Sequence, residues 1–258
     1  KNKKVVARGI VSYNFKEIKL ISGKKSSQIE NILGYIGKEE IIHRDYHDYK
    51  GYLYAVSDEG ASSLQIIDMS TLPDSVSLVY DSTDLIERTH NIFIDTVKAR
   101  LYTSNGYIYS LEDPLDPKFI YYTPLLNCHD VYVENDTAYI NRGNQGFAIV
   151  DFSQTTVENQ SHEVIGTLAS YADQGYNHSG WITTDGNYYA MSDETWGMRI
   201  KMLDISDFSN IEVIALFGSD IDVNSIPHNL IIKGNYLYTA YYHDGFYVHD
   251  ISNPSTPI

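Results

Sequence analysis

Four histidines in this chain are each followed by a small polar residue and a short alternating apolar run. An arginine takes the same place in a fifth segment, and successive pairs are 39 to 50 residues apart. Imidazole nitrogens suit zinc and similar ions, whereas carboxylates suit calcium or manganese. The residues best able to do chemistry are therefore these five pairs: Arg44-Asp45, His90-Asn91, His129-Asp130, His178-Ser179 and His228-Asn229.

The five pairs open an internal repeat. Each is followed by a run such as HNIFI or HDVYV, then a turn, then a second run such as TAYIN or YLYTA, and a third run that ends on Asp, as in GFAIVDFS. Alternating runs joined by short polar turns are typical of β-hairpins. A period of roughly 40 to 50 residues is typical of propeller blades. The sequence therefore predicts an all-β protein, a β-propeller of four-stranded blades.

The number of blades depends on how the first residues are interpreted. Residues 1–40 contain two strand-like runs, VVARGIVSY and EIKLIS, but no clear repeat. We interpret them as a partial first blade or closure strands of a single domain over residues 1–258. Together with five repeats this gives six blades, with five or seven as the alternatives. The second repeat is degenerate at Leu111 and Glu112, and we still count it as a blade.

The composition excludes several classes of function. The formal net charge of −15 repels phosphate backbones, so nucleic acid is not an expected partner. The chain has no apolar run of about 18 residues to span a bilayer, and its first residues lack the pattern of a signal peptide. The patterns GxSxG, GxGxxG and the P-loop are absent, which removes the commonest hydrolase, dinucleotide and nucleotide sites.

The predicted blades bring two sets of side chains to one end of the molecule. The first strand of a blade is innermost, and an antiparallel second strand returns to the end where the first began. The loops after the second strands therefore share a face with the opening pairs. These loops include the triplet Ser-Asp-Glu at 57–59 and again at 192–194. Candidate metal ligands on this central face are His90, His129, His178 and His228.

Three interpretations of this face remain open. The polar pairs can be structural, because buried polar groups need partners and such groups join neighbouring blades. They can hold a divalent metal ion such as zinc, calcium or manganese. They can orient an organic ligand that stacks on aromatic side chains such as Trp181 and Trp196. The predicted ligand-binding residues are Arg44, Asp45, Asn91, Asp130, Trp181, Asn229, Tyr242, His243 and Asp244.

Four segments carry a resemblance to a known family. The segments are HNIFID, CHDVYVENDTAYINRGNQGFAIVDFS, YNHSGWITTDGNYYAMSDET and IPHNLIIKGNYLYTAYYHDGFYVHDISNPSTP. Through them the chain resembles the LVIVD-repeat β-propeller proteins, and more closely the bacterial cell-surface group called choice-of-anchor B. The resemblance covers about residues 41–258, and it implies an exported, cell-surface or periplasmic propeller. Arg44 departs from the pattern, since the other openings have histidine.

We expect a binding or interaction module that uses the His- and Asp-rich central face, with a glycan, peptide or protein as its ligand. The alternative is a metal-dependent hydrolase or lyase on the same face. In that case a metal held by the histidines would lower the pKa of a bound water to about 7. Asp193 or Glu194 would then act as the catalytic base.

Overall fold

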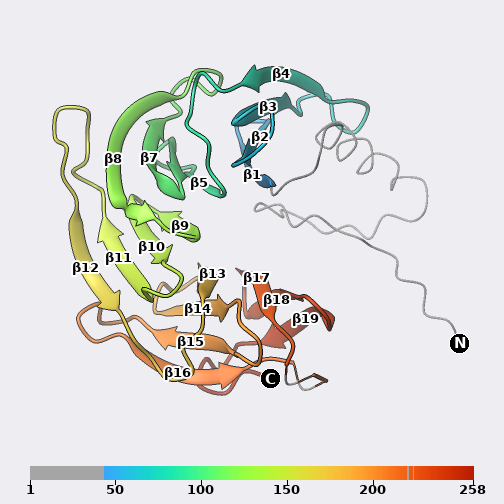
Figure 1. Ribbon diagram of the computed structural model, residues 1–258, viewed down its shortest axis with the longest axis vertical. Coiled ribbons are helices and arrows are strands. Elements are labelled where there is room, and N and C mark those ends of the chain that lie inside the picture. The colour runs from blue at the N-terminus through green and yellow to red at the C-terminus, as the bar shows by residue number, and fades with distance from the viewer. Residues whose placement is uncertain (1–43, 220, 223) are drawn as a thin grey trace, which may run out of the picture.

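The computed structural model describes residues 44–219, 221–222 and 224–258, which form five antiparallel sheets around a common centre (Figure 1). Every sheet is a meander whose strands pair in chain order. The first two sheets consist of β1 (Arg44–Tyr49), β2 (Tyr52–Ser57), β3 (Leu64–Asp68), β4 (Ser77–Ser82), β5 (Ile92–Asp95), β6 (Arg100–Thr103), β7 (Asn105–Ser110) and β8 (Lys118–Asn127). The other three consist of β9 (Asp130–Glu134), β10 (Thr137–Asn141), β11 (Phe147–Asp151), β12 (Glu163–Leu168), β13 (Asn177–Ile182), β14 (Tyr188–Asp193), β15 (Ile200–Asp204), β16 (Glu212–Phe217), β17 (Pro227–Lys233), β18 (Tyr236–Tyr241) and β19 (Gly245–Asp250).

The predicted all-β propeller is confirmed, and the degenerate second repeat is a complete blade, β5 to β8. Four blades have four strands, and the fifth has three within the described residues. The described residues hold five blades, one of the two alternatives to the expected six. The partial blade or closure strands predicted over residues 1–40 lie outside them. Among the described residues, no helix has the length and hydropathy needed to span a bilayer.

The first strand of each blade is the innermost one, as the repeat predicts. β1 contacts β5, and the contacts continue from β5 to β9, from β9 to β13 and from β13 to β17. The fourth strands β4, β8, β12 and β16 lie on the outside (Figure 1). Because equivalent strands surround the centre, residues at the same place in each repeat come close together.

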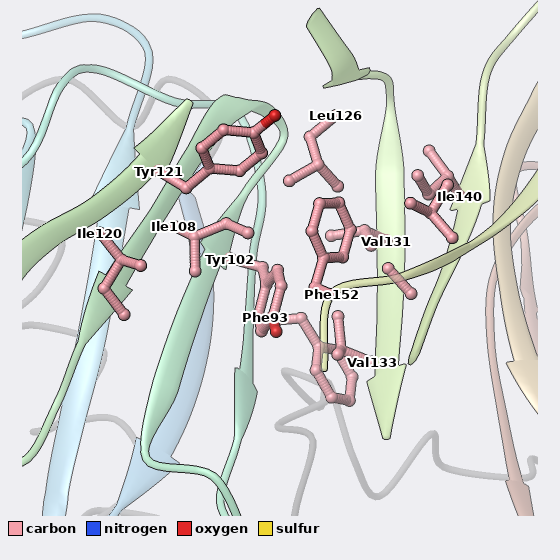
Figure 2. Close-up of a cluster of buried hydrophobic side chains, with 12 residues drawn as sticks. Phe93, Tyr102, Ile108, Ile120, Tyr121, Leu126, Val131, Val133, Ile140 and Phe152 are labelled. Atoms are coloured by element: carbon pink, nitrogen blue, oxygen red, sulfur yellow. The ribbon is translucent and has the colours of Figure 1, made fainter. Parts of the chain in front are cut away.

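The hydrophobic core lies between the blades rather than within one of them. Between the second and third blades, for example, Phe93 and Tyr102 of one sheet pack against Val131 and Phe152 of the next (Figure 2). Three similar clusters fill the other interfaces between successive described blades. The second, third and fourth sheets thus bury both of their faces, which explains why a third strand such as FAIVD is a nearly continuous apolar run.

The β9–β10 hairpin has a turn that the sequence predicts. Asn135 and Asp136 form its two-residue loop, and both have positive φ, 52° and 63°. Two-residue hairpins favour such turns because their twist matches that of the strands, and Asn and Asp tolerate positive φ better than most residues.

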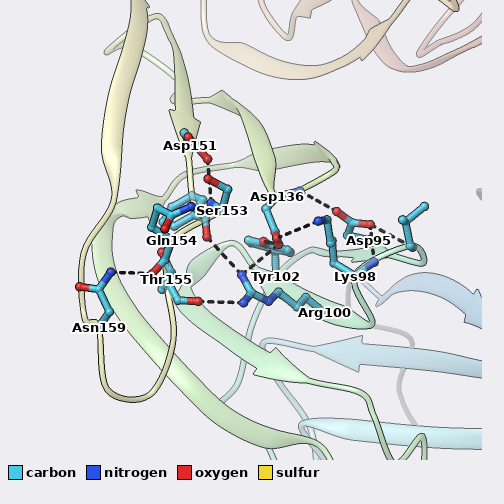
Figure 3. Close-up of polar contacts among 12 residues, drawn as sticks. Asp95, Lys98, Arg100, Tyr102, Asp136, Asp151, Ser153, Gln154, Thr155 and Asn159 are labelled. Carbon is cyan, nitrogen blue, oxygen red and sulfur yellow. Dashed lines mark hydrogen bonds and ion pairs between the residues drawn. The ribbon is translucent and has the colours of Figure 1, made fainter.

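Asp136 also joins the second blade to the third (Figure 3). Its carboxylate accepts hydrogen bonds from Arg100 at 3.0 Å and from the Tyr102 hydroxyl at 2.8 Å. The Arg100 guanidinium also donates to the carbonyl oxygens of Phe152, at 3.2 Å, and Thr155, at 2.8 Å. The Asp136 amide donates to Asp95 at 2.8 Å. This network closes the interface on the side away from the opening pairs.

Replacement of Arg100 tests this network. Arg100→Ala leaves the buried Asp136 carboxylate without its closest cation, so we expect the free energy of unfolding to fall by about 3 kcal/mol or more. Lys98→Ala is the matched control, because Lys98 is 43% exposed and its ammonium lies 4.0 Å from the same carboxylate. It should cost less than about 1 kcal/mol. Chemical denaturation measures both, and equal losses would contradict this account.

Candidate functional site

The four predicted histidines form a continuous row at the centre of one face. The ring centroids of His90 and His129 lie 4.8 Å apart, those of His129 and His178 lie 3.9 Å apart, and those of His178 and His228 lie 4.1 Å apart. They come from four successive blades. We call His90, His129, His178 and His228 the histidine row.

Irregular strand pairing helps to build this row. The register of β13 against β14 shifts between Asn177 and Ser179, so His178 is an extra residue in its strand. In β17, His228 and Asn229 likewise stand opposite the single residue Ala240. Such bulges break the strict alternation of side chains and commonly turn a residue toward a site. Two of the four histidines thus owe their position to a local irregularity.

The loops after the second strands reach the same face, as the hairpin geometry predicts. Asp58 lies beside His90, with Oδ2 2.9 Å from Nδ1. Glu194 lies between two histidines: Oε2 is 3.5 Å from Nε2 of His178, and Oε1 is 3.7 Å from Nε2 of His228. The Tyr242 hydroxyl donates to Oε1 of Glu194. Loops from the first, fourth and fifth blades therefore surround the row.

The two middle histidines are neutral at pH 7. Burial, followed by the neighbouring His90, lowers the pKa of His129 to about 4. Burial, followed by His129 and His228, holds the pKa of His178 well below its usual value. A row of four charged imidazoles would repel itself, whereas neutral rings can pack closely.

Hydrogen bonds determine which nitrogen of His129 carries the proton. Its Nδ1 lies 3.2 Å from the carbonyl oxygen of His178. A carbonyl can only accept, so Nδ1 is the donor and Nε2 carries the lone pair. His178 is almost completely buried, and its Nδ1 has no hydrogen-bond partner among the described residues. Among the described residues, one group of three side chains could hold a metal ion: ligand atoms of His129, His178 and Glu194 all lie within 4.8 Å of one another.

Some polar residues at the strand openings have the structural role that we considered. Ser179 donates to the carbonyl oxygen of His228 at 3.0 Å, and Ser192 donates to the same oxygen. Asn177 donates to the carbonyl of Gly146 at 2.9 Å. These bonds join neighbouring blades and fix the backbone that carries the row. The structural interpretation therefore applies to Ser179, Ser192 and Asn177, and the interpretation of the histidines as a metal or ligand site stays a prediction.

Asp193 and Glu194 are adjacent at the end of β14, but their carboxylates have different surroundings. Asp193 is fully buried, and its oxygens accept hydrogen bonds from Tyr171 at 2.9 Å, the Gly175 amide at 2.6 Å and the buried Lys201 at 2.9 Å. Its carboxylate is committed to these donors, so it holds the loop in place. Glu194 is the member of the pair that faces the histidines, and its role as a catalytic base stays a prediction.

A layer of packed rings lies next to the histidine row, further along the innermost strands. The residues three places after the first four openings are His47, Phe93, Tyr132 and Trp181. The rings of Phe93 and Tyr132 lie 4.8 Å apart, as do those of Tyr132 and Trp181, and His47 packs edge-on against Phe93 at 4.9 Å. Trp181, predicted to contact a ligand, belongs to this inner packing. The sequence analysis missed the layer, although the constant offset of three residues was a usable signal.

The other predicted ligand-binding residues are spread over the same end. Asn91 and Asp130 are buried at strand starts, and Asn229 is half-buried in its bulge. His243 is exposed at the rim, with its ring 5.0 Å from that of Trp196, and Asp244 accepts a hydrogen bond from Ser219. Arg44 and Asp45 lie in β1, opposite Ser57 and Val56 of β2.

Comparison with known proteins identifies the repeat. The family model described as LVIVD repeat matches residues 127–161 and 227–258, which contain the third and fifth strand openings. The chain is a β-propeller that contains LVIVD repeats. Both matched segments run from the start of an innermost strand through the Asp that ends the third strand, as in GFAIVD and GFYVHD.

Solved structures share the fold of this propeller at low sequence identity. A functionally unknown protein from Desulfotomaculum acetoxidans is 16% identical, with a TM-score of 0.60 over 81% of this chain and 65% of that one. The nidogen/laminin complex contains a chain that is 10% identical, with a TM-score of 0.54 over 84% and 78% of the two chains. The propeller domain of Cps50 (Swd1) from Myceliophteria thermophila is 13% identical, with a TM-score of 0.55 over 84% and 68%. These similarities concern the fold alone.

Curated relatives match only a short segment. Glutamate 5-kinase of Thermosynechococcus vestitus is 50% identical over 40 residues, which are 16% of this chain and 11% of the kinase. The enzyme of Agrobacterium fabrum is 55% identical over 40 residues, 10% of its length. The chain thus spans about a tenth of these relatives, and their activity is not transferred to it.

The neutral histidines predict that acid destabilises the propeller. The unfolded chain binds protons at these rings near pH 6.5, whereas folded His129 binds them only near pH 4. The free energy of unfolding therefore keeps its full value above about pH 6.5. It falls as the pH decreases toward 4, because the unfolded chain then binds more protons than the folded chain. His129 alone should cost about 2 kcal/mol between pH 7.5 and pH 5. Chemical denaturation at both pH values measures this loss of stability. The loss should be smaller in His129→Gln, which lacks the titrating ring. Equal stability of the wild-type chain at the two pH values would contradict the prediction.

Proposed function

We propose that this propeller is a binding module whose ligand contacts the histidine row and the loops around it. The observation that supports this proposal is the meeting of Glu194, Tyr242 and two histidines of the row. The Glu194 carboxylate lies 3.5 Å from His178 and 3.7 Å from His228. Contributions from neighbouring blades are typical of propeller binding faces, since equivalent loops converge at the centre.

Exposed aromatic side chains beside this group support a ligand with both polar and apolar surfaces. Trp196 is 60% exposed and Tyr242 is 55% exposed. The Tyr242 hydroxyl donates to Glu194, and the Trp196 ring lies 5.0 Å from that of His243. Aromatic faces that are open to solvent stack on the apolar side of a sugar ring or a peptide. Carboxylate and imidazole groups next to them can exchange hydrogen bonds with hydroxyls. A carbohydrate is therefore the ligand class that we favour, with a peptide or protein surface as the other outcome. The net charge of −15 argues against nucleic acid.

We also propose a location outside the cytoplasm, at the cell surface or in the periplasm. The support is the resemblance to the choice-of-anchor B group, together with the LVIVD repeats. Surface proteolysis of intact bacterial cells that express the native protein tests this part. The propeller should be cleaved or released by the protease while a cytoplasmic marker stays intact. Full protection in intact cells, followed by cleavage only after both membranes are opened, would contradict the proposal.

Substitution of the exposed aromatic residues tests the binding face. We expect the wild-type chain to retain specific glycans on an array, and Trp196→Ala or Tyr242→Ala to weaken binding about ten-fold, because stacking contributes roughly 1 kcal/mol or more per ring. Tyr236→Ala is the matched control: Tyr236 is 47% exposed but begins β18, at the opposite end of the hairpin. It should bind like the wild type. Binding to neither glycans nor peptides, or equal losses in all three variants, would refute the proposed face.

A further inference from the structure

We infer that His129, His178 and Glu194 form a binding site for a divalent transition-metal ion such as zinc. This inference deepens the proposed function and rests on it, because the metal lies within the same face. Its first support is composition: two imidazoles and one carboxylate form a ligand set that zinc uses where it keeps a position open for an external group. Calcium is disfavoured, because it takes six to eight oxygen ligands.

The distances around Glu194 agree with a shared ion. Two atoms bound to one tetrahedral zinc ion lie about 3.3 Å apart. The Glu194 oxygen and the His178 nitrogen are separated by 3.5 Å, long for a hydrogen bond and close to this value. All three ligand atoms lie within 4.8 Å of one another, so closure around an ion requires movements of about 1 to 2 Å. Glu194 stands in a loop and is partly exposed, so it can supply most of that movement.

The surrounding hydrogen bonds already orient two of the three ligands. Nδ1 of His129 donates to the carbonyl oxygen of His178 at 3.2 Å, which leaves the Nε2 lone pair for a metal. The Tyr242 hydroxyl donates to one oxygen of Glu194. Metal-binding histidines and carboxylates generally have such supporting partners, which fix the tautomer and the direction of the lone pair.

The buried ring of His178 is the observation that favours a ligand over a purely structural cluster. Its Nδ1 has no hydrogen-bond partner among the described residues, and the residue is 4% exposed. An imidazole always offers two polar nitrogens, and leaving one of them buried without a partner is costly. Nε2 of the same ring has only the 3.5 Å contact with Glu194, so a metal ion bound at Nε2 would supply a strong bond that the described residues do not give this buried ring. The bulge at His178 gives the same indication, since bulges are frequent beside functional sites.

The blade repeat provides a matched control. The triplet Ser-Asp-Glu occurs after β14, ending on Glu194, and after β2, ending on Glu59. Glu59 is exposed, and among the described residues its carboxylate makes no hydrogen bond or ion pair. Glu194→Gln and Glu59→Gln therefore remove the same charge from the same place in two blades. Both positions are in loops at the surface, so both variants should fold.

The test is a titration of the full chain with zinc chloride after treatment with chelator and dialysis. We expect calorimetry to give one equivalent of zinc bound by the wild type, an affinity at least about ten-fold weaker in Glu194→Gln, and no change in Glu59→Gln. Cobalt is a second probe, because its visible absorption reports tetrahedral nitrogen and oxygen ligands; the band should be lost in His129→Ala. No zinc bound by the wild type, or equal affinity in both glutamine variants, would overturn the inference.

Array binding with and without zinc separates the two proposals. Zinc that binds stoichiometrically to a chain that retains no glycan or peptide would leave the metal site standing and refute the binding module. Glycan binding that is identical in chelator and in zinc, together with an absence of zinc in the titration, would refute the metal site and support the module. Glycan binding that requires zinc and is lost in Glu194→Gln would support both.

Discussion

The burial of apolar sheet faces between successive blades is the constraint on which this structure depends. No sheet here can cover its own apolar side chains, so each packs against the next, and the twist of the sheets arranges the blades around a common centre. The innermost strands are then held side by side. Residues at one position of the repeat, far apart in the chain, become neighbours at the centre. The histidine row follows from this geometry.

The same constraint means that a polar residue at the centre lowers the stability of the fold unless it has a hydrogen-bond partner. Backbone and side-chain groups at the strand openings are removed from water by the next blade, so each needs a partner. Ser179, Ser192 and Asn177 meet this need by bonding to the backbone of adjacent blades. The histidines solve it differently: the inner ones remain neutral and pack ring against ring. One nitrogen of His178 has no partner among the described residues, and the same holds for the amide oxygens of Asn91, Asn141 and Asn177. Hydrogen bonds within the described residues thus satisfy some of the polar groups at the centre and not others.

The end of β14 illustrates how one step along a strand changes a role. Asp193 and Glu194 carry the same charge, but Asp193 points into the blade, where Lys201 and Tyr171 compensate its carboxylate. Glu194 follows the last residue of the strand and reaches the neighbouring histidines instead. The buried ion pair of Asp193 and Lys201 fixes the loop after β14. The fixed loop then holds the Glu194 carboxylate beside the histidines. A rigid support beneath an adjustable group is the usual arrangement of a binding site.

The sequence by itself determined the fold class, the boundaries of the repeats and the end of the molecule at which the histidines and nearby carboxylates lie. Periodicity and turn residues act locally, so they can be recognised without knowledge of packing: HDVYVENDTAYI predicts its own hairpin. The spacing of His90, His129, His178 and His228 placed them on one face for the same reason. Only the tertiary structure decided which of these groups touch. The bulges at His178 and His228, the separation of Asp193 from Glu194, and the packing of Trp181 into an inner aromatic layer depend on contacts between blades, and residues that are distant in sequence decide such contacts.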